Sequence, residues 1–396
     1  MNPARLGSSR DTDVYVAGVF EHPRREIPEL STPRVHAEVA SGALADAGLS
    51  FSDVDGYLCD GSQNYRPVAF GVLSMADYLG LRCTYLDSTE TGGSAPVVHV
   101  AHAAAAIAAG RCQVALVTSA GRPRSAPTPH ERGSAEGGFE DVWGMSGAVT
   151  GYALSAQRHM HEFGTTSSQL AEVKVAASLH AQHNPNAFLR DLVSVAEVLE
   201  SPMVSSPLHR LDCCVVTDGG GACVLVSGAV ARQLSGRCVK VLGSGEAARH
   251  SDLGRLSLTS TAAAVSGPRA FAAAGVAPGD IDYVSLYDSF TITVVETIED
   301  LGFCEKGEGG RFVTDGALVA PHGRLPYNTD GGGMCNNHPG NRGGITKVVE
   351  AVRQLRGEAT PAVQVPDCEL ALVNGTGGNV GTRMGSATLI LGRRDT

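Results

Sequence analysis

The sequence predicts an α/β protein made of two similar halves, each with a central sheet covered by helices on both faces. Three observations lead to this prediction. The chain repeats part of itself, its most apolar segments alternate with helix-like stretches, and its composition changes in the middle. Repeated segments indicate units of the same architecture. The expected organisation is an N-terminal half over 1–121, an inserted loop and cap region over 122–237, and a C-terminal half over 238–396.

Two pairs of segments carry the repeat. Residues 43–55 read ALADAGLSFSDVD and residues 270–282 read AFAAAGVAPGDID, with identical Ala, Gly and Asp residues at a shift of 227. Residues 112–121 read CQVALVTSAG and residues 368–377 read CELALVNGTG, at a shift of 256. The larger second shift indicates a longer insertion in the second half.

Each half follows the same order of elements. A short strand comes first, followed by a helix ending in Ala-Gly, a strand after Asp-x-Asp, a second helix and an uninterrupted apolar strand. Gly48 and Gly275 stand where a left-handed glycine commonly ends a helix. Apolar strands without alternation are typical of a sheet covered on both faces. In the first half we expect the first strand at 14–19, the second helix at 95–109 and the closing strand at 114–117. In the second half we expect them at 239–242, 346–355 and 370–373.

The middle region differs in composition from both halves. Residues 122–138 are rich in Pro, Ser, Gly and Arg, which indicates a loop. Residues 151–161 and 169–182 read as helices. An inserted cap of this kind is a natural place for substrate-binding surfaces.

Composition limits the possible partners and compartments. A net charge of -10 gives no global reason to bind nucleic acid or an anionic membrane. The longest apolar stretch, 97–109, is too short to span a bilayer, and no signal-peptide pattern precedes the first strand. The ten cysteines include no C-x-x-C pair, so we expect reduced thiols in a cytoplasmic protein and no metal site.

Four segments sit where an α/β sheet gathers ligands, at strand ends and helix starts. They are DSTETGGSA at 87–95, YDSF at 287–290, NTDGGGMCNNHPGNRGG at 328–344 and NGTGGNVG at 374–381. Each has a structural alternative. Ser94 can simply cap a helix, Tyr287 can bond a sheet edge, and the glycine-rich segments can be tight turns. Separately, Arg122, Arg124 and Arg132 form a basic cluster that could meet a phosphate-bearing ligand, although a solvated loop is the default reading.

Together these segments resemble the thiolase superfamily, especially the sterol-carrier-protein-type thiolases and their lipid-transfer-protein relatives. YDSF corresponds to the family's His-Asp-Cys-Phe pattern. NTDGG followed by NHPG corresponds to its Asn-x-x-Gly-Gly and Gly-His-Pro patterns. The segment SPMVSSPLHRLDCCVVTDGGGACVLV at 201–226 resembles the stretch before the second half. The resemblance covers nearly the whole chain and implies a duplicated thiolase-like fold with layers in the order αβαβα.

The departures from the family pattern bear on the chemistry. The family spacing places its nucleophilic Cys at Gly93, and no residue of 87–95 is cysteine. The second catalytic Cys is missing from 374–381, and Tyr287 replaces the activating His. Only the Gly-His-Pro-type histidine is present, as His338. Without a thiol to take the acyl group, the thiolase double displacement is excluded.

The resemblance extends to Cys-less thiolase-like aldolases of steroid side-chain degradation, which cleave β-hydroxyacyl-CoA thioesters by retro-aldol chemistry. On this hypothesis Tyr287, in a lowered-pKa or relayed state, takes the hydroxyl proton or returns one to carbon. Asp288 orients or tunes it, His338 donates a hydrogen bond to the thioester oxygen, and Tyr327 is a second acid/base candidate. The expected contacts to the CoA substrate are Gly93, Ser94, Asn328, Gly378, Arg122 and Arg124.

The resemblance also implies partners. It predicts a homodimer and a small partner protein of the DUF35 type, with an OB-fold and a zinc ribbon. No bound cofactor is expected, since coenzyme A enters as part of the substrate. Two alternatives stay open: a non-thiol acyltransferase or condensing enzyme using Ser94 or a partner's thiol, and a non-catalytic subunit that binds acyl-CoA.

Overall fold

The computed structural model describes residues 12–60, 71–126, 147–234, 236–250, 255, 257–380 and 383–393. The main strands are β1 (Val14–Glu21), β2 (Gly56–Cys59), β3 (Tyr85–Asp87), β4 (Val114–Gly121), β7 (Gly219–Ser227), β8 (Val239–Arg249), β9 (Tyr283–Leu286), β10 (Leu370–Gly378) and β11 (Met384–Arg393). The helices are α1 (Thr32–Ala47), α2 (Gly71–Tyr78), α3 (Ala95–Ala108), α5 (Gly147–Phe163), α6 (Ser167–Ala181), α7 (Val195–Glu200), α8 (Gly228–Ala231), α9 (Ala263–Ala274), α10 (Thr291–Asp300), α11 (Gly309–Phe312) and α12 (Gly344–Arg356).

The main strands form one mixed sheet in the order β3-β2-β4-β7-β1-β8-β11-β10-β9. The sheet is narrowest between β1 and β8, where only Tyr15–Lys240 and Val16–Val239 are paired. This joint divides it into a first half-sheet, β3-β2-β4-β7-β1, and a second half-sheet, β8-β11-β10-β9. The second half-sheet comes from the predicted C-terminal half, whereas the first combines strands of the predicted N-terminal half with β7.

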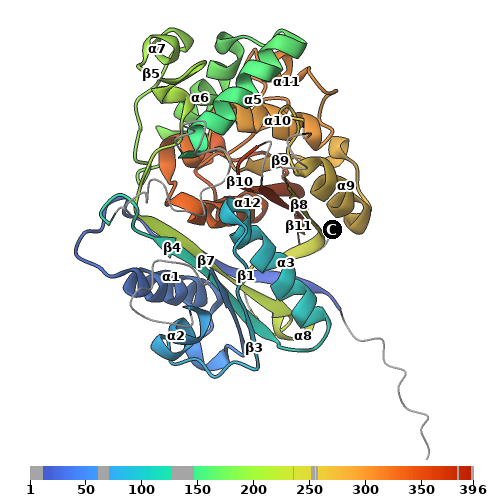
Figure 1. The fold of residues 1–396 in the computed structure, drawn as a ribbon. Coiled ribbons are helices and arrows are strands. Elements are labelled where there is room, and N and C mark those ends of the chain that lie inside the picture. The colour runs from blue at the N-terminus through green and yellow to red at the C-terminus, as the bar shows by residue number, and fades with distance from the viewer. Residues whose placement is uncertain are drawn as a thin grey trace, which may run out of the picture.

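The predicted layer order is confirmed. Helices α3 and α12 lie between the two half-sheets and contact both (Figure 1). Helix α1 packs on the outer face of the first half-sheet, and α9 packs on the outer face of the second. The buried side chains accordingly form one apolar cluster around α3 and α12 and two clusters on the outer faces.

The internal repeat appears as equivalent contacts. Helices α1 and α9 both end at a left-handed glycine, Gly48 with φ 69° and Gly275 with φ 72°. Leu116 and Leu372 point into the outer clusters, whereas the adjacent Val117 and Val373 point into the central one. Both faces of these strands are therefore buried, which explains why their sequences show no alternation.

Residues 122–237 contribute to two parts of the molecule. Helices α5, α6 and α7 and the hairpin of β5 (Met203–Ser205) and β6 (Leu208–His209) lie over the second half-sheet (Figure 1). The segment also contains β7, which pairs with both β1 and β4 in the first half-sheet. The region expected as an insertion thus supplies a central strand of the first half. Residues 127–146, with Arg132, lie outside the described residues.

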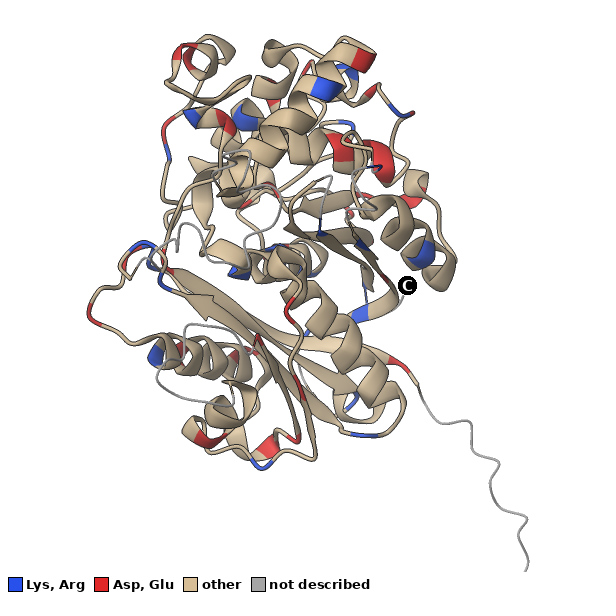
Figure 2. Cartoon of the chain, in the orientation of Figure 1, with Lys and Arg blue, Asp and Glu red and all other residues tan. Residues whose placement is uncertain are grey.

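Acidic and basic residues are both distributed over the chain in the cartoon of Figure 2. No helix in the described ranges is long and apolar enough to cross a membrane.

Two aspartates of the repeat hold corresponding strands. Asp55 Oδ1 accepts hydrogen bonds from the Gln113 and Val114 amides at 2.9 and 2.8 Å. Asp282 Oδ2 likewise accepts bonds from the Glu369 and Leu370 amides at 2.8 and 2.9 Å. Each carboxylate therefore ties the start of one strand to the start of its parallel neighbour.

Replacing Asp282 with alanine is expected to lower the free energy of unfolding by about 1–3 kcal/mol, because two amides at the start of β10 lose a charged acceptor. Urea unfolding monitored by circular dichroism measures the change. The control is Glu369→Ala, since this neighbouring side chain is exposed. Equal midpoints for the two variants would contradict the assigned role of Asp282.

Candidate active site

Tyr287 stands at the point where β9 ends and the chain turns into α10. Its amide donates to the Asn374 carbonyl of β10 at 2.9 Å, which continues the parallel pairing of the two strands by one residue. Its hydroxyl donates to the Gly340 carbonyl at 3.2 Å, and the residue is 5% exposed. Tyr287 is thus fixed at both ends, with its ring between the end of the sheet and the loop that carries His338.

The ring of Tyr287 packs directly against Gly93, the residue before the buried Ser94 that precedes α3. A Cβ atom placed on Gly93 would lie 2.3 Å from Tyr287 Cζ and 2.4 Å from the Thr376 carbonyl oxygen. No residue larger than glycine fits there without displacing its neighbours. The tyrosine ring therefore fills the volume in which the family resemblance would place the nucleophilic thiol.

The glycine-rich end of β10 meets the turn before α3, as expected for Gly93 and Gly378. A Cβ atom on Gly377 would lie 1.7 Å from the Thr91 carbonyl oxygen, and one on Gly92 would lie 2.9 Å from the Gly378 amide nitrogen. This contact brings backbone from both halves of the chain to the edge of the Tyr287 ring. Backbone that approaches so closely can present amides to a ligand oxyanion.

His338 follows a single π-helical turn, Gly332–Asn336. Its amide donates to Thr217 Oγ1 at 2.8 Å, and its ring meets the Tyr287 ring edge to face with centroids 5.3 Å apart. The Nε2 atom is buried and has no hydrogen-bond partner within the described part of the chain. Burial lowers the pKa of His338 to about 4, although Asp288 opposes this shift. The imidazole is therefore neutral at physiological pH.

The phenol of Tyr287 is also neutral. Burial raises its pKa well above 10, and the neighbouring Cys214, Tyr152 and Asp288 raise it further, against a smaller effect of Arg342. The expectation of a lowered pKa at Tyr287 was wrong, because the opposing effect of Arg342 is smaller than the cost of losing water. Tyr287 is a proton donor at rest and not a base.

The Asp288 carboxylate binds the π-helical turn and Lys347. It accepts hydrogen bonds from the Gly333 and Met334 amides at 2.8 and 3.1 Å and forms an ion pair with Lys347 at 2.9 Å. Both charged side chains are almost fully buried. Asp288 thus anchors the π-helical turn ahead of His338 and does not contact the phenol oxygen.

Two further candidates have structural contacts. The Tyr327 hydroxyl is fully buried and donates to the Val173 carbonyl of α6 at 2.8 Å. The Asn328 side chain uses its oxygen and nitrogen on the amide and carbonyl of Leu286, at 2.8 and 2.9 Å. The structure therefore corrects both assignments: Tyr327 is bonded to α6 and is not a second acid/base, and the buried Asn328 side chain holds the end of β9.

Ser94 is fully buried, and its hydroxyl donates to the Thr91 carbonyl at 2.7 Å. Its side chain is not exposed and no base contacts its hydroxyl in the part of the chain that the structure describes, so Ser94 is not an activated nucleophile in this arrangement. The arginines expected to meet phosphate bind the protein itself. Arg122 donates to the Ile27 and Pro28 carbonyls, both at 3.2 Å. Arg124 lies 3.3 Å from Glu26 and stacks on the Phe188 ring.

Several residues at the site carried no sequence signal that would have singled them out. Thr217 positions His338, and Tyr152 donates to the Gly378 carbonyl at 3.3 Å. Cys214 raises the pKa of Tyr287. Burial raises the pKa of the Cys214 thiol itself far above 9, so this thiol stays protonated. Finding these residues from sequence would have required knowing which distant segments meet at the end of β9.

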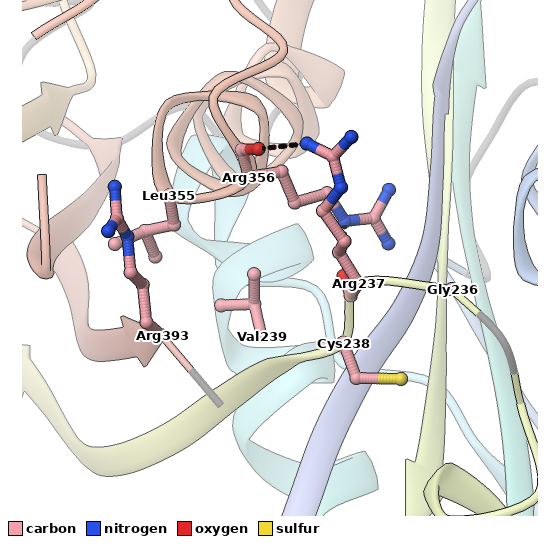
Figure 3. A pocket seen from close by; sticks show the side chains of 7 residues that line it. All are labelled: Gly236, Arg237, Cys238, Val239, Leu355, Arg356 and Arg393. Atoms are coloured by element: carbon pink, nitrogen blue, oxygen red, sulfur yellow. Dashed lines mark hydrogen bonds between the residues drawn. The ribbon is translucent and has the colours of Figure 1, made fainter. Parts of the chain in front are cut away.

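A cavity of about 440 Å³ lies at the other end of α12, roughly 20 Å along the helix from Gly344. Its lining includes Arg237, Arg356 and Arg393 (Figure 3). Arg237 donates to the Arg356 carbonyl at 2.6 Å, and Arg356 donates to Asp46 at 2.8 Å and to the Ala17 carbonyl at 2.7 Å. Arg237 and Arg356 therefore tie the end of α12 to the neighbouring strand and helix.

Comparisons with known proteins agree with this architecture. The family model "Thiolase C-terminal domain-like" matches residues 245–393. An acetyl-CoA acetyltransferase of Methanothermobacter thermautotrophicus is 34% identical over 93% of this chain and 97% of its own. The 17-hydroxy-3-oxo-4-pregnene-20-carboxyl-CoA lyase of Mycobacterium tuberculosis is 33% identical over 91% of this chain and 94% of its own.

A solved structure, the "Ltp2-ChsH2(DUF35) aldolase", superposes with a TM-score of 0.85. It is 30% identical in sequence, and the match covers 96% of this chain and 98% of that one. Sequence and structure therefore point to the same group of proteins. The chain belongs to the thiolase superfamily and is a thiolase-fold enzyme of its SCP2-thiolase-like aldolase group.

Proposed function

We propose that the protein is a retro-aldol C–C lyase that cleaves a β-hydroxyacyl-CoA thioester. The observation that carries the proposal is the contact between the Tyr287 ring, which covers Gly93, and the ring of His338. The Nε2 atom of His338 is buried and has no hydrogen-bond partner among the described residues. This arrangement offers a proton donor and a proton acceptor and no nucleophile. Retro-aldol cleavage needs the first two and does not need the third.

The neutral state of each side chain assigns its part in the reaction. His338 hydrogen-bonds its own backbone, a bond that we assign to Nδ1–H, and takes the β-hydroxyl proton at Nε2, which has no partner among the described residues. The Cα–Cβ bond breaks, and its electron pair enters the thioester to form an enolate. Tyr287 then gives its proton to Cα and regains one from protonated His338, whose ring packs against the phenol ring. The products are a ketone or aldehyde and a shortened acyl-CoA.

These roles keep one of the two alternatives expected from sequence for Tyr287, the return of a proton to carbon. They replace the role expected for His338, a hydrogen bond to the thioester oxygen. Backbone amides near Gly93 and Gly378 supply the hydrogen bonds to the enolate oxygen, because these two glycine segments meet beside the phenol ring. Preorganised amides of this kind contribute several kcal/mol to stabilising an oxyanion. Coenzyme A enters as part of the substrate, and no separate cofactor takes part.

The substrate class and partners extend the proposal. A steroid or lipid side-chain thioester is supported by the name of the Mycobacterium tuberculosis relative, and a DUF35 partner by the name of the similar solved complex. We propose a cytoplasmic homodimer that works with such a partner. An acyltransferase is the second candidate, because one relative is named acetyl-CoA acetyltransferase. The buried hydroxyl of Ser94 argues against that candidate.

The test is an assay of the purified protein over β-hydroxyacyl-CoA thioesters from short acyl chains to steroid side chains, with and without a DUF35 protein. We expect release of a carbonyl product and a shortened acyl-CoA, and an unchanged intact mass of the enzyme. A covalent acyl adduct would favour the acyltransferase instead. Acyl-CoA binding without turnover in any mixture would identify a non-catalytic subunit.

The pH profile of kcat/KM is expected to be flat from roughly pH 5.5 to 9. The pKa of His338 is lowered to about 4, so its neutral form is present above that value and is lost only as the pH falls through it. The pKa of Tyr287 is raised well above 10, so its proton is lost only in strong alkali. An acid limb centred between pH 6 and 7 would contradict the assignment of His338 as the base.

A further inference from the structure

We propose that Asp288 and Lys347 form a positioning pair that holds Tyr287 and His338 in register and keeps the electrostatic field at the His338 imidazole balanced. The inference deepens the proposed function and rests on it. The contacts of Asp288 are to Lys347 and to backbone amides of the π-helical turn, so both side chains act through the two catalytic residues.

The pair connects three segments that the sequence keeps far apart. Asp288 follows Tyr287 directly at the end of β9, and Lys347 lies in the first turn of α12. Their ion pair measures 2.9 Å, with side chains 0% and 1% exposed. The Asp288 carboxylate also accepts the Gly333 and Met334 amides of the π-helical turn before His338. One carboxylate therefore joins the segments that carry the phenol, the imidazole and the start of α12.

Gly333 lies between the Asp288 carboxylate and the His338 imidazole. A Cβ atom on Gly333 would lie 2.9 Å from Asp288 Oδ1 and 3.1 Å from His338 Cδ2, so the carboxylate and the imidazole flank the same glycine. On Gly332, a Cβ atom would lie 2.1 Å from Asp288 Oδ2. The turn fits the carboxylate closely, and a shift of Asp288 must move the imidazole or the Tyr287 ring beside it.

The two charges act on His338 with opposite signs. Burial is the main cause of the lowered pKa of His338, while the Asp288 carboxylate raises that pKa and the Lys347 ammonium lowers it. Both partners stay charged, because each counteracts the cost of burying the other: the pKa of Asp288 is lowered and the pKa of Lys347 is raised. The Tyr287 phenol, whose ring meets the imidazole edge to face, is neutral. Arg342 lowers the pKa of Tyr287, but burial raises it by more.

The test compares Asp288→Asn, Lys347→Met and the double variant with the full-length protein. The pKa of His338 is measured in the substrate-free protein by NMR of histidine labelled with ¹³C, and the His338 signal is assigned with His338→Gln. We expect Lys347→Met to raise this pKa by about one unit or more and Asp288→Asn to lower it. The double variant is expected to return it close to the starting value.

Activity gives the second readout. Each single variant is expected to lower kcat on the order of 10²-fold with a smaller change in KM, because the phenol and the imidazole lose their alignment. The double variant is expected to regain part of the loss. Lys174→Met is the matched control: this buried lysine bonds the same turn, at the Met334 carbonyl and Cys335 Sγ, and is not among the groups that shift the pKa of His338.

The control variant is expected to leave the His338 pKa unchanged whatever it does to thermal stability. Shifts of the same sign in both single variants, or a comparable shift in Lys174→Met, would overturn the proposal. Because the NMR titration needs no substrate, it decides the inference even if the protein cleaves no thioester. If one single variant fails to fold, the other still tests the proposal. A raised His338 pKa in Lys347→Met, or a lowered one in Asp288→Asn, supports it, and the opposite sign overturns it.

Discussion

Replacing Tyr287 with phenylalanine is expected to lower kcat for thioester cleavage by about 10²–10⁴-fold. The change removes the hydroxyl that returns a proton to Cα and leaves the ring against Gly93, so the shape of the site is kept. KM is expected to change little, because the lost interaction acts mainly in the transition state. Steady-state kinetics with the best thioester from the substrate panel measure both constants.

The matched control is Tyr327→Phe. It also removes a buried tyrosine hydroxyl, here one that donates to the Val173 carbonyl away from Tyr287. We expect a loss of about 1–2 kcal/mol in the free energy of unfolding and a nearly unchanged kcat. Full lyase activity in Tyr287→Phe would refute the role of this phenol. An equal fall of kcat in both variants would mean that the effect comes from stability.

Replacing Gly93 with alanine is expected to cause the second large effect. The added methyl group would sit 2.3 Å from Tyr287 Cζ and 2.4 Å from the Thr376 carbonyl oxygen, so the ring, the end of β10 or both must move. Overpacking of this kind costs about 1–3 kcal/mol of stability. A displaced phenol is expected to lower kcat on the order of 10²-fold.

Thermal unfolding and steady-state kinetics test this prediction together. Gly279→Ala is the control, because its Cβ position has no atom within 4 Å and the residue is exposed. That variant should keep both the wild-type melting temperature and the wild-type kcat. A Gly93→Ala enzyme with unchanged stability and kinetics would show that the ring does not pack where the structure places it. Gly93→Cys is expected to suffer the same overlap and to gain no acyl transfer.

Much of the fold follows from local patterns. The repeat over 43–55 and 270–282 predicted two helices with the same glycine ending, and both glycines adopt left-handed conformations. The apolar strands at 114–117 and 370–373 predicted a sheet buried on both faces, and α3 and α12 cover the shared inner side. Strand β7 was not separated from the insertion, because nothing local in GGGACVLVS shows that its partners are β1 and β4.

The candidate site divides in the same way. The sequence by itself determined that no residue of 87–95 is cysteine and that glycine-rich segments end the closing strands, since these are statements about residue type and order. The resemblance to the thiolase family implied that Gly93 and Tyr287 stand where a cysteine and a histidine are expected. Only the tertiary structure decided which groups hold protons and where they point. Burial and neighbours from distant segments set the pKa values of Tyr287 and His338, turned Tyr327 toward α6 and joined Asp288 to Lys347. The physical reason is that a pKa or a hydrogen bond depends on distances in space, which residue order along the chain does not contain.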